Sequence, residues 1–306
     1  MNKKKPDIFG GKLFDVEHAL NMHAANFFYL PAAAIYNQEM LAPHAELIAR
    51  CHIYVIGFVP RVNFVNAEQQ DRDLVLTYEV LGNSYDLIWE LPPGAALLNE
   101  NDHWYVDNGT GQRFFPNEGT CLQRLNQQYG LMRFLVKYIG QAYGQDGSRS
   151  ALDRLTKHET LQKISLLGAP EGYRLELVLL QVEPNNQIIT MFNPFAENMD
   201  EGEARISQGL DKLFNTSEQE RVALYEAAMI RYFQPEFNKE FKNSFPSTSL
   251  KVLQDCYDKD FSSVSAELVL GELPVVLYSE TIAPSDEHFA HHDLHTDEAR
   301  KVFFAK

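Results

Sequence analysis

The stretch EAAMIRYFQPEFN, residues 226–238, carries the pattern from which the fold is inferred. Ser217 and Glu220 upstream form a capping box, which predicts a helix beginning near residue 218. Pro235 predicts that this helix ends near Tyr232, because the residue before a proline avoids the α region. The neighbours of Glu226 one turn away on either side are all apolar. These neighbours are Val222, Ala223, Met229 and Ile230. We therefore expect a carboxylate on the buried stripe of an amphipathic helix.

Burying a carboxylate costs free energy unless a cation or hydrogen bonds compensate. The functional interpretation of Glu226 is a metal-binding or catalytic carboxylate. The structural interpretation is an ion pair with an Arg or Lys side chain, for which Arg154 is a candidate, and buried ion pairs produce the same sequence pattern. The position alone leaves both interpretations open.

A second group of polar residues lies upstream, in a predicted strand, loop and helix. Residues 132–139 are predicted to form the strand, and residues 149–164 the helix. Arg154 and His158 are spaced four residues apart, so they would share one face of that helix. Arg binds phosphate oxygens through two parallel hydrogen bonds, and His can transfer a proton. Phosphate recognition and a simple solvated helix face are both compatible with this pair.

Taken together, these segments resemble the GIY-YIG nuclease family. The matching features are Tyr138-Ile139-Gly140-Gln141 at the end of a strand, the Arg-x-x-x-His spacing, and the Glu226 helix ending in Pro235-Glu236-Phe237-Asn238. They span residues 138–238, a third of the chain. The family's first motif, Gly-Ile-Tyr, is absent as written from its expected place about ten residues before Tyr138. Either Tyr129 supplies the tyrosine hydroxyl of that motif, or the first strand lies further back and is followed by an insertion. In the second case Tyr85 or Tyr105 would supply the hydroxyl.

The resemblance implies a role for each matching residue. Tyr138 would orient or deprotonate the attacking water, and Arg154, or else Arg149, would stabilise the phosphate in the transition state. His158 would assist proton transfer. Glu226 would hold one divalent metal ion, typically Mg²⁺, and Asn238 would fix the local backbone or a substrate contact. The implied reaction is metal-assisted hydrolysis of a phosphodiester bond.

The resemblance implies an α+β fold with a small antiparallel sheet flanked by helices. We divide the 306 residues into three parts: a mixed α/β domain at 1–118, the nuclease-like core at 119–246 and an acidic appendage at 247–306. Further elements are predicted from local pattern. They are a helix at 16–28, strands at 52–58, 73–81 and 85–91, a helix at 120–128, paired strands at 173–182 and 188–192, a hairpin of 264–270 with 275–281, and a helical end rich in histidine.

The chain is acidic, with 27 Lys and Arg against 42 Asp and Glu and a net charge of −15. This balance excludes a general nucleic-acid coat and adhesion to anionic membranes. The charge is uneven, because residues 129–165 hold six basic and three acidic side chains, whereas residues 255–298 hold one Lys and eleven acidic side chains. The basic excess surrounds the proposed site. The acidic tail would serve as an autoinhibitor or as a surface for a protein partner.

Four histidines gather near the end of the chain at positions 288, 291, 292 and 295. On a helix three of them would share a face, so a zinc site and a packed or solvated helix both fit. Cys51, Cys121 and Cys256 are odd in number and far apart, which argues against a disulfide framework. The longest apolar run, 27–36, is too short for a membrane span. We expect a cytoplasmic protein that does not enter a membrane.

The sequence therefore predicts a magnesium-dependent endonuclease that cuts DNA or RNA. Restriction, phage defence and DNA repair are the settings expected by analogy of fold. The rival hypothesis is a non-catalytic binding or regulatory protein built on the same scaffold.

Overall fold

A computed structural model describes residues 10–101, 103–144, 150–183, 187–246, 250–271 and 273–301. The fold is α+β, and its largest sheet has eight strands. The strands are β1 (Val16–Pro31), β2 (Ile53–Pro60), β9 (Arg133–Gln141), β10 (Tyr173–Val182), β11 (Gln187–Phe192), β12 (Ser263–Val269), β13 (Val276–Tyr278) and β14 (Glu287–Asp293). Their order is β13-β9-β2-β10-β1-β12-β14, with β11 paired to β1 beyond the end of β10.

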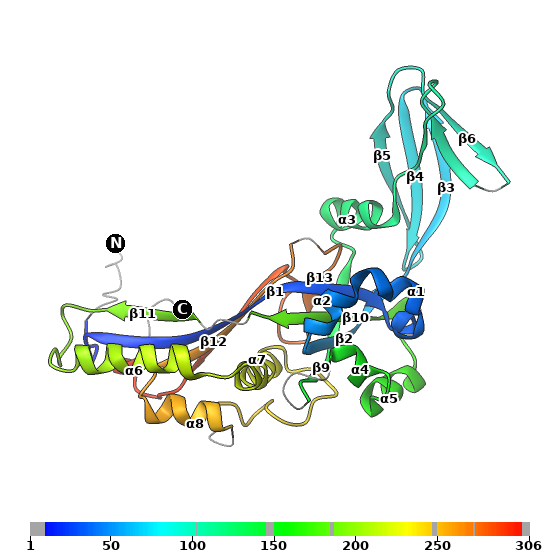
Figure 1. The fold of residues 1–306 in the computed structure, drawn as a ribbon. Coiled ribbons are helices and arrows are strands. Elements are labelled where there is room, and N and C mark those ends of the chain that lie inside the picture. Colours follow the sequence, from blue (N-terminus) through cyan, green and yellow to red (C-terminus); the bar gives the residue numbers. More distant parts are fainter. Residues whose placement is uncertain are drawn as a thin grey trace.

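Helices cover this sheet from more than one side. They are α1 (Gln38–Leu41), α2 (Ala45–Arg50), α3 (Glu118–Tyr129), α4 (Ala151–Leu155), α5 (Glu159–Leu167), α6 (Gly202–Asn215), α7 (Glu218–Phe233) and α8 (Lys251–Asp258), with short 3-10 turns at Ala32–Tyr36, Ala42–His44 and Glu298–Arg300. The helices α6, α7 and α8 lie along one side of the sheet (Figure 1). The predicted capping box of Ser217 and Glu220 is confirmed at the start of α7, which packs on β9, β12 and β14.

A separate arm projects from the sheet between β2 and β9 (Figure 1). It consists of β3 (Val62–Gln70), β4 (Asp73–Val80), β5 (Asn83–Glu90), β6 (Ala96–Glu100), β7 (His103–Asp107), β8 (Arg113–Phe114) and α3. The arm has its own hydrophobic cluster. Since β2 and β9 are antiparallel neighbours, the arm occupies the place where a short hairpin turn would otherwise join them.

Most predicted elements with a strong local pattern are confirmed. These are the strands β2, β9 and β10, the hairpin of β4 and β5, and the helices α3 and α7. The helix predicted at 16–28 is wrong, because these residues belong to β1. Strand β1 is flanked by β10 and β11 on one side and β12 on the other, and nearly all residues from 16 to 24 are buried. A strand buried on both faces lacks the alternation that would distinguish it from a buried helix.

Two predicted strand pairings and the predicted helix at the end of the chain are also wrong. Strand β12 pairs with β1 and β14, and β13 pairs with β9, so 264–270 and 275–281 form no hairpin. Strand β11 pairs with β1, not with β10. The predicted histidine-rich helix is the strand β14. In each case a partner distant in sequence decides the pairing, and local pattern does not contain that information.

All three predicted segments contribute strands to the one large sheet. Strands β1 and β2 come from 1–118, β9 to β11 from 119–246, and β12 to β14 from 247–306. The predicted appendage is therefore part of the sheet. The three cysteines are free and buried. None of the described helices is both long and apolar enough to cross a membrane.

Candidate functional site

Two tyrosines lie side by side where β2 and β9 pair. Tyr54 is opposite Gly140 in the ladder, and its ring stacks on that of Tyr138 with centroids 6.2 Å apart. A Cβ on Gly140 would lie 2.5 Å from Cζ and Oη of Tyr54 and 2.8 Å from Cε1 of Tyr138. Only glycine therefore allows the two rings to approach the strand this closely.

His158 joins this pair from the connection between α4 and α5. Its ring centroid lies 5.3 Å from that of Tyr54 and 5.2 Å from that of Tyr138. The prediction of one helix over 149–164 is wrong: α4 ends at Leu155, and His158 is the N-cap of α5. Arg154 and His158 therefore do not share one helix face, although both lie at this site. Arg149 is outside the described residues.

The hydrogen bonds of His158 fix what its ring can do. The backbone N–H of Leu161 donates to Nδ1 at 3.1 Å, so Nε2 carries the ring proton. Burial and the nearby charge of Arg154 lower the pKa of His158 to about 4. At neutral pH the ring is therefore neutral, and Nε2–H is its hydrogen-bond donor.

Glu226 reaches the site from α7 and is 9% exposed. Burial raises the pKa of its carboxyl to about 8; hydrogen bonds with Gln141 oppose this shift, and the negative charge of Glu240 adds to it. Within the described residues no ion pair joins Glu226 to a Lys or Arg side chain, so the structural interpretation of an ion pair with Arg154 is not what we observe. The charge of Glu226 raises the pKa of both Tyr54 and Tyr138, which indicates that it lies near both.

Arg154 is the solvent-exposed member of the group. Burial raises the pKa of Tyr54, and the neighbouring Tyr138 and Glu226 raise it further, whereas a hydrogen bond with Arg154 and its positive charge lower it. Tyr54 is only 1% exposed. The guanidinium of Arg154 therefore stands between a buried hydroxyl and solvent, where it can meet an anionic ligand.

Asn238 supports the site from behind. Its Nδ2 donates to the carbonyl of Ile139 at 2.8 Å, and the N–H of Ile139 donates to its Oδ1 at 3.0 Å. The N–H of Phe237 donates to the carbonyl of Lys137 at 3.0 Å. Residues 237–238 therefore bond to β9 beyond the stretch that pairs with β13, just before Gly140. Asn238 was predicted either to fix the local backbone or to contact the substrate, and these hydrogen bonds fit the first role.

The tyrosine that accompanies Tyr138 is one that the sequence reasoning missed. Tyr129 donates to the carbonyl of Asp86, Tyr85 packs on Tyr129, and Tyr105 donates to Glu100. All three lie in the arm, so none of them supplies the second tyrosine hydroxyl beside Tyr138. The available signal was Ile53-Tyr54 within a strongly β-forming segment, but Tyr54 stands 84 positions before Tyr138.

Basic side chains flank the 236–238 segment. Lys137 forms an ion pair with Glu236, and the Nζ atoms of Lys137 and Lys163 lie 6.0 and 5.6 Å from the ring centroid of Phe237. Arg154, Lys157 and Lys163 are exposed, whereas Lys137 is half-buried and paired with Glu236.

The four histidines near the end of the chain have structural partners. His288 contacts the carbonyl of Ser285, His292 that of Ala228 on α7, and His295 that of Phe261, each at 3.0 Å. His291 lies 3.2 Å from Asp293. Among the described residues, no three His, Cys, Asp or Glu side chains come together as a group that could hold a metal ion. A zinc site built from several histidines is therefore not found there.

No protein-family model matches the chain, and neither a curated protein nor a solved structure matches it significantly.

Proposed function

We propose that the chain is a metal-dependent phosphodiester hydrolase with a catalytic centre of the GIY-YIG type. The observation that supports this most is the meeting of Tyr54, Tyr138, Glu226, His158 and Arg154, which come from four separated segments of the chain. Four of these were selected from the sequence without knowledge of the fold. A chance selection of residues spread over nearly 90 positions would not be expected to converge on one site.

We assign the family's first motif to Ile53-Tyr54. Six residues follow Tyr54 in β2 and five precede Tyr138 in β9. If a two-residue hairpin turn replaced the arm, about 13 residues would separate the two tyrosines, a few more than the roughly ten that the resemblance implies. The arm inserted between the two strands explains why the motif was not found by spacing.

Glu226 suits a single divalent cation. It is a buried carboxylate without a cationic partner among the described residues, and carboxylate oxygens are ligands that Mg²⁺ prefers. A bound cation would supply charge stabilisation in the transition state and activation of water. The N–H groups of Gln141 donate hydrogen bonds to the Glu226 carboxyl, and the carboxylate of Glu240 is close enough for its charge to act on Glu226.

The remaining residues have roles that follow from their contacts. Arg154, always charged and exposed, would bind a phosphate oxygen and neutralise charge there. His158 would donate a hydrogen bond from Nε2–H, and with a pKa of about 4 it would not act as the proton donor at neutral pH. A tyrosine hydroxyl would orient the attacking water. Burial and the charge of Glu226 raise the pKa of Tyr138, and the charge of Arg154 offsets only part of this shift, so Tyr138 would act as a neutral hydroxyl.

Cleavage assays test the proposal directly. The purified chain is incubated with supercoiled plasmid, single-stranded DNA and RNA, with Mg²⁺ and with a chelator. We expect cleavage only with the metal ion, and a loss of at least about 10²-fold in rate for Glu226→Gln, since the removed charge acts in the transition state. Glu68→Gln, on the exposed surface of the arm, is the matched control.

Absence of cleavage of every substrate, or undiminished cleavage by a folded Glu226→Gln variant, would overturn the assignment. Cleavage of DNA over RNA, or the reverse, would identify the substrate class. A role in restriction, phage defence or repair would follow from such an activity and is part of the same proposal.

A further inference from the structure

The strand β11 presents an edge that lacks the usual protection. Its sequence, QIITMF, holds no charged residue and no proline. Strand β11 pairs with β1 on one side, and within the described part of the chain no strand pairs with its other side. Natural proteins protect such edges with charges, prolines, bulges or a covering element, because unpaired N–H and C=O groups recruit other strands.

The helix α6, which packs beside this edge on β1 and β11, has its polarity reversed. It buries Arg205 and Lys212, at 4% and 2% exposure, and exposes Ile206, Leu210 and Phe214, at 38%, 50% and 78%. The three exposed residues are spaced four apart, so they form one stripe along the helix. A helix on a sheet normally buries its apolar stripe.

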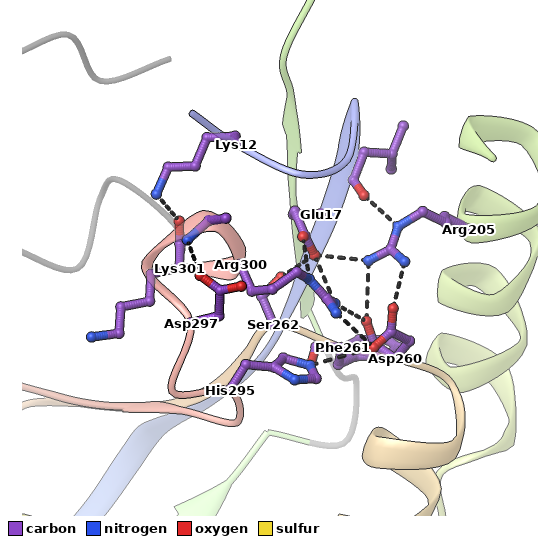
Figure 2. Close-up of polar contacts among 12 residues, drawn as sticks. Lys12, Glu17, Arg205, Asp260, Phe261, Ser262, His295, Asp297, Arg300 and Lys301 are labelled. Carbon is purple, nitrogen blue, oxygen red and sulfur yellow. Dashed lines mark hydrogen bonds and ion pairs between the residues drawn. The ribbon is translucent and has the colours of Figure 1, made fainter. Parts of the chain in front are cut away.

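Ion pairs explain why α6 buries its basic side chains and exposes its apolar stripe. The Arg205 guanidinium contacts Glu17 at 2.8 Å and Asp260 at 2.7 Å (Figure 2). Lys212 binds Asp255 at 2.5 Å. These pairs fix Arg205 against β1 and Lys212 against α8. The apolar stripe consequently points away from the core of its own chain.

The exposed apolar surface continues from β11 into the loop that leads to α6. Phe192, Phe195 and Met199 are 62%, 74% and 50% exposed. At roughly 200 Å² for a phenylalanine side chain, Phe192, Phe195 and Phe214 alone expose on the order of 400 Å². A stable interface buries about 800 Å² on each partner, and the strand edge and aliphatic residues of the stripe add to this area. The surface is therefore large enough to form the centre of a dimer interface.

We propose that two copies of this chain associate through β11 and the exposed stripe of α6. An antiparallel pairing of β11 with β11 of the second copy is isologous, closes on itself and leaves neither edge free. The strand carries no charge, so pairing with its own copy places no like charges opposite each other, despite the net charge of −15. Because α6 packs on β11, the same two-fold axis would place the α6 helices of the two copies beside each other, with their exposed stripes available for contact. This proposal does not depend on the nuclease assignment.

The test is the molar mass of the full chain in solution, measured by size-exclusion chromatography with light scattering over a range of concentrations. We expect the wild-type chain at twice the monomer mass. The double variant Leu210→Glu and Phe214→Glu should run as a monomer, since both residues are exposed and the change places like charges across the axis. Leu166→Glu, on α5 and 88% exposed, is the matched control and should remain a dimer.

Amide hydrogen exchange of the wild-type chain supplies a second measurement that needs no variant. The amides of β11 should become more protected as the concentration rises through the dimerisation range, whereas those of the arm strand β5 should not change. A wild-type monomer at all concentrations, a dimer that persists in the double variant, or β11 exchange independent of concentration would each overturn the proposal. If the wild-type chain is a monomer, the partner that pairs with the edge of β11 would instead be a strand of a different protein.

Discussion

Replacing Gly140 by alanine perturbs the two tyrosines without removing any functional group. The new Cβ would lie 2.5 Å from Tyr54 and 2.8 Å from Tyr138, whereas ordinary contacts begin at 3.4 Å. Relief therefore needs a shift of about 0.9 Å between strand and ring. The Tyr54 ring is 1% exposed and cannot swing into solvent.

This clash has two calculable consequences. Overpacking of a well-filled site costs about 1–3 kcal/mol of stability, which urea unfolding measures. A displacement near 1 Å of a positioning group costs about 10²-fold in rate, which plasmid nicking by the magnesium-loaded protein measures. The loss of rate should exceed that expected from the fraction unfolded. Gly119→Ala, where the nearest atom to the added Cβ is 3.4 Å away, is the control.

The reasoning would be refuted if Gly140→Ala kept both the stability and the cleavage rate of the wild-type chain. Retained stability with lost activity would instead mean that the backbone yields, and that the ring positions still matter.

Two further predictions concern buried charge. In the metal-free protein the pKa of Glu226 is about 8 when folded against 4.5 in the unfolded chain. Protonated Glu226 therefore contributes stability that is complete below pH 4.5 and is lost as the pH rises through 8, on the order of 5 kcal/mol at about 1.4 kcal/mol per pH unit. Denaturant unfolding of Glu226→Gln from pH 5 to 9 should show a flatter pH profile than that of the wild type, and parallel profiles would contradict this. Arg205→Met should cost about 3–5 kcal/mol of stability, because Glu17, at 0% exposure, would keep just one charged partner among the described residues, Arg300. Arg72→Met, in the exposed pair with Glu90, should cost under about 1 kcal/mol by urea unfolding, and equal losses in the two variants would count against the account.

The parts of the fold that the sequence predicted are those with local signals. The capping box of Ser217, the hairpin of β4 and β5 and the run of β10 depend on neighbours within a few residues. Strand β1 and the order of the sheet depend on pairings across more than 100 residues, such as Ala19 with Ser263. Periodicity carries no information about those pairings.

The candidate site follows the same division. Glu226 could be found because an acidic residue on an apolar helix stripe is a conflict visible in the sequence. Tyr54 could not be found, because an arm of some 70 residues separates its strand from β9 and only the folded sheet brings them together. The break before His158 was missed because the capping signal of a histidine Nδ1 is weak in a sequence. The reversed α6 was missed because the partners of Arg205 are distant.

The central claim is that Tyr54 completes the site, and the initial rate of magnesium-dependent plasmid cleavage by Tyr54→Phe and Tyr129→Phe tests it most directly. Both variants remove one hydroxyl and keep the ring, but Tyr129 lies in the arm and donates to the carbonyl of Asp86. We predict a loss of about 10²–10⁴-fold for Tyr54→Phe and wild-type rate for Tyr129→Phe. Wild-type rate in Tyr54→Phe, or an equal loss in both variants, would contradict the account.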